Sequence, residues 1–209
     1  MKQPIGKLAA VAGTAAAALA LTAVPAPAAP STVWTVGPAP GRFTAVNSGN
    51  VVLAVNGLAL PCTRSTATGR VQDATGNPAP VAVVDTLVLG APGAPCATPL
   101  GPMTITPVTP VPVLAQDHAA GVTKGYVDNA DLKVTVGACT FRAVGRTSAS
   151  YTNATRTFAV NSLAGELTVV SATGCGAAVP VGSKPTFKGN YLVTMVDTGV
   201  GPTIVGSNP

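Results

Sequence analysis

Residues 138–176, ACTFRAVGRTSASYTNATRTFAVNSLAGELTVVSATGCG, decide the fold class of this chain. Two runs rich in Val, Thr and Ala lie between Cys139 and Cys175, and a Thr-Asn turn separates them. Short runs of β-branched and aromatic residues bounded by Gly, Asn and Ser are typical of strands. We therefore predict a disulfide-closed β unit here, and a similar unit between Cys62 and Cys96.

The composition supports an exported β protein and argues against a nucleic-acid partner. The chain is 47% hydrophobic and only 9% charged, with 23 Gly and 20 Pro. Such a chain can bury a core, while its many breakers divide it into short segments. The basic residues are scattered singly and leave a mature net charge of about +3, without the clusters that phosphate binding requires.

The first 28 residues have the pattern of a secretory signal peptide. Lys2 and Lys7 precede an apolar, Ala-rich run over 8–24, and Ala26 and Ala28 stand at the small-residue positions of an A-x-A site. We place cleavage after Ala28. An uncleaved membrane anchor is the rival interpretation, but the run is weakly apolar. No later run is long and apolar enough to span a membrane, so we expect a secreted protein.

The mature chain alternates apolar and polar residues with a period of two, which predicts half-buried strands. Turn residues such as Asn47-Ser48-Gly49-Asn50 and Asn56-Gly57 separate these runs. Helical spacing is scarce, so we predict an all-β fold, an antiparallel β-sandwich or flattened barrel of about ten strands. The clearest strands are expected at 33–36, 43–46, 51–55, 58–64, 81–89, 157–160, 167–170 and 187–196.

Three further segments carry specific expectations. The run 103–114 contains three prolines, which lack the donor that a central strand needs, so it should be an edge strand or an extended connector. Residues 121–127 and 132–136 are expected to form a hairpin around Asp128-Asn129-Ala130-Asp131. We take 29–198 as one β domain and 199–209 as a loose C-terminal tail.

The four cysteines favour two disulfides, because an exported chain reaches an oxidising compartment. Three pairings are open. We prefer Cys62 with Cys96 and Cys139 with Cys175, since each bond then closes one meander within its own half. A metal site is the poorer alternative, because no C-x-x-C pair exists and the chain has one histidine. A faint similarity of segments 43–107 and 121–196 raises the hypothesis of an internal repeat.

No catalytic or metal-binding constellation is evident, and we expect no cofactor. The single histidine, His118, lies in a polar turn, and no G-x-S-x-G elbow supplies a nucleophile. Asp128 and Asp131 lack the ligand spacing of a calcium loop, so a turn explains them better. Asp85 interrupts an apolar strand, and we expect Arg64 or Arg70 to pair with it. The sequon at Asn153 is interpreted as a turn.

Aromatic side chains are the remaining candidates for ligand binding, because sugars stack on aromatic faces. The chain is only 4% aromatic, and it needs most of these residues in its core. A polysaccharide-binding surface would require at least two of the candidates to be exposed and coplanar. The candidates are Trp34, Tyr126, Tyr151 and Tyr191.

The chain resembles a family of small secreted actinobacterial proteins of unknown function. The resemblance covers nearly the whole mature chain and is carried by VWTVGPAPGRFTA, CATPLGPMTITPV, GVTKGYVDNADLKVTVGACTF, YTNATRTFAV, ELTVVSATGC and FKGNYLVTM. These are strand and turn signatures. The resemblance implies export, four paired cysteines and a β fold, and it brings no known site.

The sequence therefore predicts a non-catalytic protein of the cell envelope or extracellular space. Its expected partners are cell-wall polysaccharide or other surface proteins. Self-assembly through Thr- and Val-rich strands is a second hypothesis, and it predicts an uncovered apolar patch. A hydrolase is the third, and it requires His118 within hydrogen-bond reach of a Ser and an Asp.

Overall fold

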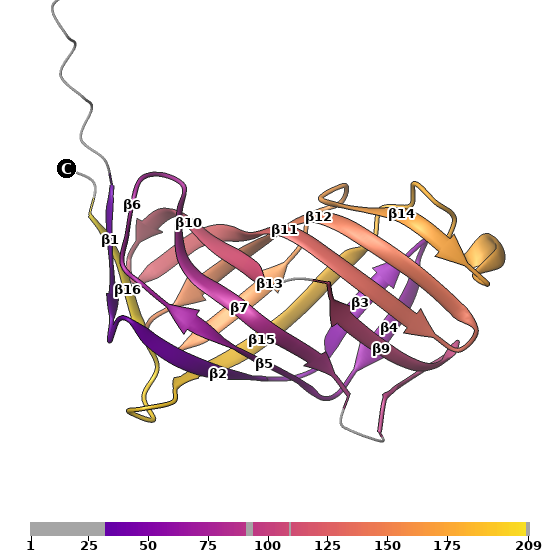
Figure 1. Cartoon of the computed structure of the whole chain (residues 1–209), viewed down its shortest axis with the longest axis horizontal. Helices are drawn as coiled ribbons and strands as arrows, with labels where there is room; N and C mark the ends of the chain where they lie inside the picture. Colours follow the sequence, from indigo (N-terminus) through magenta and orange to yellow (C-terminus); the bar gives the residue numbers. More distant parts are fainter. Residues whose placement is uncertain (1–31, 91–93, 109, 208–209) are drawn as a thin grey trace, which may run out of the picture.

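Antiparallel β-strands make up the architecture of the protein in a computed structural model (Figure 1). The structure describes residues 32–90, 94–108 and 110–207, so the predicted signal peptide over 1–28 lies outside the described residues. Within these ranges the helical structure is one 3₁₀ turn, η1 (Gly176–Ala178). None of the helical structure described could reach across a membrane. The prediction of an all-β fold is confirmed.

Eight strands form a closed antiparallel barrel. Each pairs with the next around the ring, and the eighth pairs with the first, so the wall is hydrogen-bonded all the way round. In ring order the strands are β2 (Gly41–Asn47), β5 (Ser65–Val71), β7 (Ala79–Leu89), β10 (Val111–Ala119), β11 (Val122–Val136), β12 (Cys139–Thr152), β13 (Thr157–Asn161) and β15 (Thr186–Met195).

Three of the barrel strands are long enough to extend beyond the ring and pair with additional strands. There β11 pairs with β9 (Gly101–Pro107), β12 pairs with β14 (Leu167–Thr173), and β15 pairs with β3 (Val51–Val55). Two short strands continue these pairings, β4 (Leu58–Cys62) on β3 and β8 (Cys96–Thr98) on β9. The additional strands therefore extend one end of the barrel.

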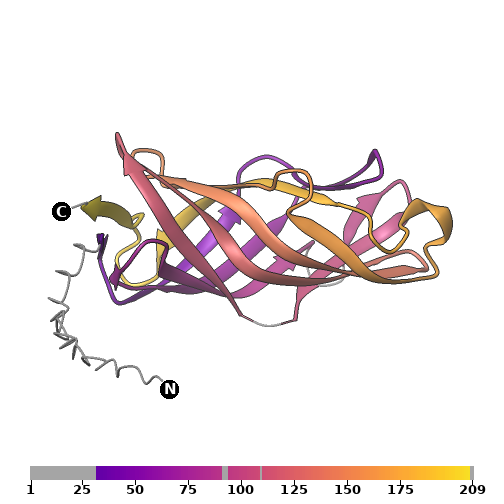
Figure 2. The same cartoon turned by 90° about the horizontal axis from the view of Figure 1, so that it is seen from above.

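A separate three-stranded sheet covers the other end of the barrel, and we call it the cap. It consists of β1 (Val33–Gly37) between β6 (Ala74–Thr75) and β16 (Thr203–Ser207). Figure 2 shows its indigo and yellow strands together at one end. The expectation of a loose tail over 199–209 is wrong for the described residues, because 203–207 form a strand whose Ile204 is buried.

The two disulfides join Cys62 to Cys96 and Cys139 to Cys175, the pairing preferred from the sequence. The first connects the ends of β4 and β8. The second connects the start of β12 to the residue just after β14 and its turn. Both bonds therefore lie among the additional strands, away from the cap.

The additional strands and the barrel share one apolar core. Large side chains such as Phe141, Leu53, Leu60, Met103 and Leu167 are fully buried there. Burial of such a side chain contributes about 1.5–3 kcal/mol. The end of the barrel that carries the additional strands is thus filled with side chains.

The expected hairpin over 121–136 is wrong, because β11 is one continuous strand. Its pairing with β12 shifts between Val127 and Ala130, and Asn129 adopts φ of 49°. A β-bulge therefore takes the place of the predicted turn, and the strand keeps its direction through it. The turn-forming residues bend the strand at the point where its neighbour changes from β10 to β9.

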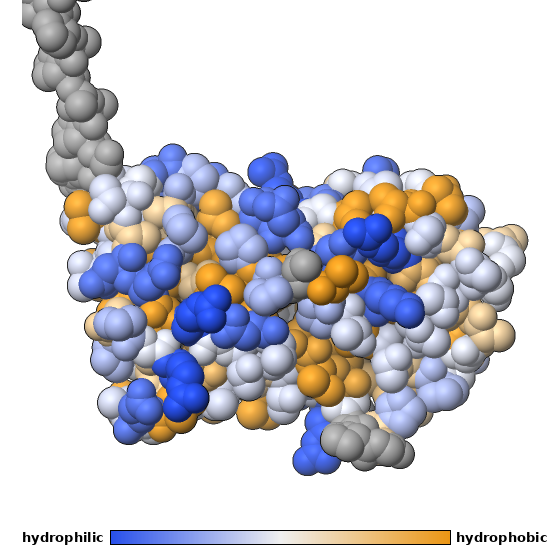
Figure 3. Space-filling model, in the orientation of Figure 1, coloured by the Kyte–Doolittle hydropathy of each residue, from blue (hydrophilic) through white to orange (hydrophobic). Residues whose placement is uncertain are grey.

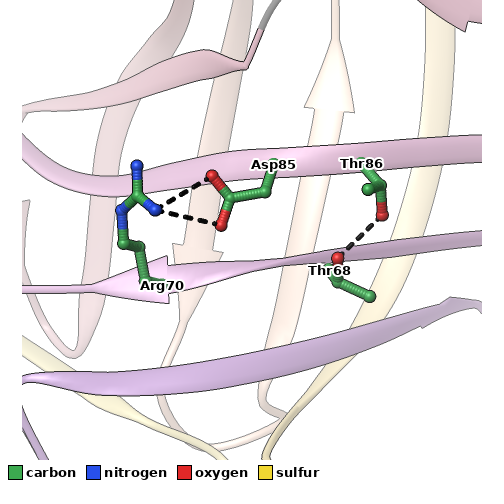
Figure 4. Close-up of polar contacts among 4 residues, drawn as sticks. All are labelled: Thr68, Arg70, Asp85 and Thr86. Atoms are coloured by element: carbon green, nitrogen blue, oxygen red, sulfur yellow. Dashed lines mark hydrogen bonds and ion pairs between the residues drawn. The ribbon is translucent and has the colours of Figure 1, made fainter.

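Asp85 is explained by a second bulge, in β7. The register with β5 passes from Thr86 directly to Val84, which leaves Asp85 as the extra residue. Its side chain faces outward, and Arg70 Nη1 lies 3.3 Å from Asp85 Oδ1, as Figure 4 shows. Beside this pair the hydroxyls of Thr68 and Thr86 are 2.7 Å apart. The expectation that Arg64 or Arg70 pairs with Asp85 is confirmed for Arg70.

Candidate functional site

The lumen of the barrel holds a large apolar cavity. Small side chains face inward on four strands, namely Ala45, Ala67, Ala115 and Ala149. An eight-stranded barrel is just wide enough for side chains to fill or for one small ligand to fit. Because methyl groups cannot fill this width, a cavity of about 120 Å³ remains, and all eight strands contribute to its lining.

An aromatic row crosses the lumen from the cap side of β12 to β15. Tyr151, Phe158 and Tyr191 are direct cross-strand neighbours on β12, β13 and β15, and all three line the cavity. Side chains directly opposite each other on one face of a sheet lie in contact range. Thr123 extends this row on β11, opposite Tyr151. The row adds three aromatic rings to a lining that also contains Phe43, Tyr126 and Phe187.

The polar groups of this row are bound to the protein itself. Tyr151 donates its hydroxyl to Pro202 O at 2.6 Å, the Tyr191 hydroxyl lies 3.0 Å from Ser65 Oγ, and Thr123 Oγ1 lies 2.8 Å from His118 Nδ1. Burial raises the pKa of both tyrosines to about 12, so they are uncharged at neutral pH. Lys124 is the charged residue in the lining, but its side chain is exposed on the outward-facing side of β11. The lumen thus offers uncharged, apolar surface.

The cap closes the barrel above the aromatic row. Pro202 and Ile204 are buried and line the cavity. Asn153 fixes them by donating from Nδ2 to Ile204 O at 2.8 Å and accepting at Oδ1 from Ile204 N at 2.9 Å. A Cβ atom on Gly201 would lie 2.4 Å from Cγ of Arg156, so another residue there would require the Arg156 side chain to move. Asn153 therefore holds the cap, which gives its sequon a structural role.

The four aromatic candidates do not form an exposed platform, and that expectation is wrong. Trp34 is 1% exposed in the cap, where its Nε1 donates to Gly76 O at 2.9 Å. Tyr151 and Tyr191 are buried in the lumen. Tyr126 is half-buried on β11 under Arg146, whose guanidinium carbon lies 5.2 Å from the ring centre. The chain has few aromatic residues, and it uses the large side chains of Trp34, Tyr151 and Tyr191 to fill its interior.

The geometry of a hydrolase is not present among the described residues. His118 bonds to the hydroxyl of Thr123, and no serine or carboxylate in the described ranges bonds to it. Ser162 Oγ accepts from Phe187 N at 2.6 Å and is buried. No group of three or more His, Cys, Asp or Glu side chains in the same ranges is arranged to hold a metal ion.

The acidic residues of the β11 bulge have structural partners. Asp131 accepts from Arg142 Nε at 2.6 Å and forms an ion pair with its Nη2. The hydrogen bond from Arg142, together with its charge, holds the pKa of Asp131 below its usual value against the opposing effect of burial. Asp128 accepts from the side chain of Asn129 at 2.9 Å. Side-chain contacts of Asp128 and Asp131 therefore accompany the β-bulge of β11.

Glu166 connects the β13–β14 loop to the barrel, a role that the sequence did not reveal. Its carboxylate accepts from Ser148 N, Ser148 Oγ and Leu163 N at 2.8, 2.6 and 2.8 Å. Burial raises the pKa of Glu166, but these hydrogen bonds and the charge of Arg146 outweigh it and the pKa lies below its usual value. A lone Glu in a Gly-containing loop gives no signal of such a role.

Comparisons with family models, curated proteins and solved structures found no match to this chain. The resemblance to small secreted actinobacterial proteins therefore stays a prediction. The function of the protein is therefore inferred from its own structure, above all from the lumen.

Proposed function

We propose that this protein is a non-catalytic binding protein that holds a small, uncharged, apolar molecule in the lumen of its barrel. The observation that carries the proposal is the unfilled cavity of about 120 Å³, lined by aliphatic and aromatic side chains from all eight ring strands. Protein interiors are normally close-packed, and a void forfeits dispersion contacts. A ligand that fills the lumen recovers those contacts.

The volume defines the class of ligand. An engineered apolar cavity of about 150 Å³ stays dry and binds benzene or xenon. A single aromatic ring or a short branched alkyl group therefore fits this lumen. Tyr151, Phe158 and Tyr191 provide ring edges and faces for an aromatic guest, which prefers offset or edge-to-face contacts. Because the tyrosine hydroxyls already have partners, the guest needs no polar group.

We propose that the protein acts outside the cell. The predicted signal peptide carries this part of the proposal, and the two disulfides of the structure are compatible with an oxidising compartment. In that setting a soluble carrier of apolar molecules would serve uptake, storage or sequestration at the cell envelope.

Titration of the mature chain, residues 29–209, with fluorobenzene tests the binding proposal. Saturable binding by ¹⁹F NMR is expected. Ala149→Leu should abolish it, because the added side chain occupies the lumen, and the melting temperature should not fall. Ala59→Leu, an exposed position on β4, is the matched control and should bind as the wild type does. Absence of saturable binding by the wild type, or full retention of binding by Ala149→Leu, would contradict the proposal.

Association with a second copy of the chain is a second candidate function, favoured by one exposed row. Leu192, Val46 and Val88 are 49%, 52% and 45% exposed, and with Thr66 they form a continuous cross-strand row over β15, β2, β5 and β7. Such an uncovered apolar row suits an interface between copies. Size-exclusion chromatography should show a dimer that Val46→Lys dissociates. A strict monomer at high protein concentration would refute this second function.

A further inference from the structure

Next to its pairing with β10, the ring strand β7 lies beside the additional strand β9, and these two strands are not hydrogen-bonded to each other. Strand β7 pairs with β10 up to Val84, and β9 pairs with β8 only through 101–103. The end of β7 beyond Val84 and strand β9 then lie side by side without a ladder between them (Figure 1). We call this stretch the seam. Pro107 contributes to it directly, because it has no N–H to donate.

The seam is lined by apolar side chains that belong to the lumen. Val84, Leu87, Pro107 and Val111 all line the cavity. Three of them, Val84, Leu87 and Pro107, are half-buried rather than buried. Apolar surface is visible in Figure 3 over the region where β7 and β9 run side by side in Figure 1. At the seam, therefore, the lining of the lumen continues toward the outer surface.

The other routes into the lumen are closed. The capped end is covered by Pro202 and Ile204, which Asn153 and Tyr151 fix with three hydrogen bonds. The opposite end is filled by the buried side chains of the core, Phe141 and Leu167 among them. Elsewhere the ring is continuously hydrogen-bonded, and separating two paired strands breaks several ladder bonds at once.

We infer that an apolar ligand passes in and out of the lumen laterally, through the seam between β7 and β9, and that Leu87 is the side chain controlling its passage. This inference rests on the proposed binding of an apolar molecule in the lumen. Passage through the seam requires displacement of side chains and breaks no backbone hydrogen bond of the sheet. The seam accordingly selects slender, uncharged molecules, since the side chains that line the lumen there, Val84, Leu87, Pro107 and Val111, are apolar.

Exchange kinetics of fluorobenzene with the mature chain, measured by ¹⁹F NMR, test the inference. A residue at a passage changes both the association and the dissociation rate constant, whereas a residue that only contacts the bound ligand changes mainly the dissociation rate constant. We expect Leu87→Ala to raise both rate constants by about tenfold, equivalent to a barrier lowered by about 1.4 kcal/mol. Leu87→Trp should lower both. Val170→Trp, at an exposed position of β14, is the matched control and should leave both unchanged.

Asn153→Ala tests the alternative route at the capped end. If ligands pass through the seam, this variant exchanges fluorobenzene at the wild-type rate. Equal acceleration of both rate constants by Asn153→Ala, with none by Leu87→Ala, would overturn the inference and assign passage to the cap. If Leu87→Trp fills the lumen and abolishes binding, the exchange rates of Leu87→Ala alone decide between the seam and the capped end. Absence of fluorobenzene binding by the wild type would instead contradict the binding proposal itself.

Discussion

Asn153 and Ile204 exchange two hydrogen bonds, through the side-chain amide of the first and the backbone N–H and C=O of the second. An amide side chain here takes the place of a neighbouring strand. The C-terminal segment is thereby fixed over the barrel, although its backbone pairs only with β1.

Asn153→Ala should therefore destabilise the protein by about 2–4 kcal/mol, because it leaves two backbone groups of Ile204 without partners. Urea unfolding measures this loss, and hydrogen exchange should show faster exchange for the amides of 203–207. Asn161→Ala, at an exposed residue of β13, is the control and should stay within about 0.5 kcal/mol of the wild type. An equal effect of both variants would show that Asn153 does not hold the cap.

Glu166→Gln should weaken the fold at neutral pH. The pKa of Glu166 is lowered in the folded state, so its stabilisation is present above the ordinary carboxyl pKa and is lost as pH falls through the folded value. We expect a loss of about 1–3 kcal/mol at pH 7 that shrinks toward zero in acid. Urea unfolding at a series of pH values measures it. Asp117→Asn, an exposed carboxylate, should show no such dependence, and a loss for Glu166→Gln that persists in acid would disprove the role of its charge.

Tyr191→Phe should reduce the loss of stability in alkali. Burial raises the pKa of Tyr191 to about 12, against the opposing effect of the hydrogen bond with Ser65. The contribution of Tyr191 to folding stability is therefore complete below the ordinary tyrosine pKa, and it is lost as pH rises toward 12. This contribution is roughly 2–3 kcal/mol. Tyr126→Phe is the matched control and should keep the alkaline loss of the wild type. Absorbance titration of tyrosinate follows the same group, and ionisation of Tyr191 at the pKa of a free tyrosine would refute its burial.

Replacement of both Cys139 and Cys175 by Ser should cost about 4 kcal/mol, because the bond closes a loop of 36 positions. Neither cysteine lines the lumen, so fluorobenzene binding should survive wherever the variant stays folded. Guanidinium unfolding and ¹⁹F NMR measure the two properties separately. A stability loss below about 1 kcal/mol would show that the unfolded chain gains little freedom when the bond is removed.

The strands and disulfides could be predicted because their signals are local. Alternation in 43–46 and 187–196 specifies strands directly, and export limits Cys62, Cys96, Cys139 and Cys175 to a few pairings. The prolines of 103–114 predicted an edge correctly for 104–107 of β9, which pair with β11 on one side only. For 111–114 that prediction is wrong, because β10 pairs with β7 and with β11 as a strand of the ring.

The errors and the missed site depend on contacts between distant parts of the chain. Asp128-Asn129 has the composition of a turn, yet long pairing with β12 keeps β11 extended, so the pair becomes a bulge. Segment 203–207 is short and follows Gly residues, and only β1, far away in sequence, makes it a strand. The lumen arises from Ala45, Ala67, Ala115 and Ala149, whose common orientation exists only once the ring closes.

The cap also shows when the lumen becomes an enclosed space. Ser207 Oγ donates to Val33 O across 174 positions of sequence, and Phe43 of β2 pairs with Met195 of β15 across 152 positions to close the wall. Contacts this remote form slowly, because the intervening chain must be ordered first. Both the wall and the cap are thus completed by the last strands of the chain, β15 and β16, joining the first, β1 and β2. The interior that would hold a ligand exists only after these strands have joined, so ligand binding reports on the final step of folding.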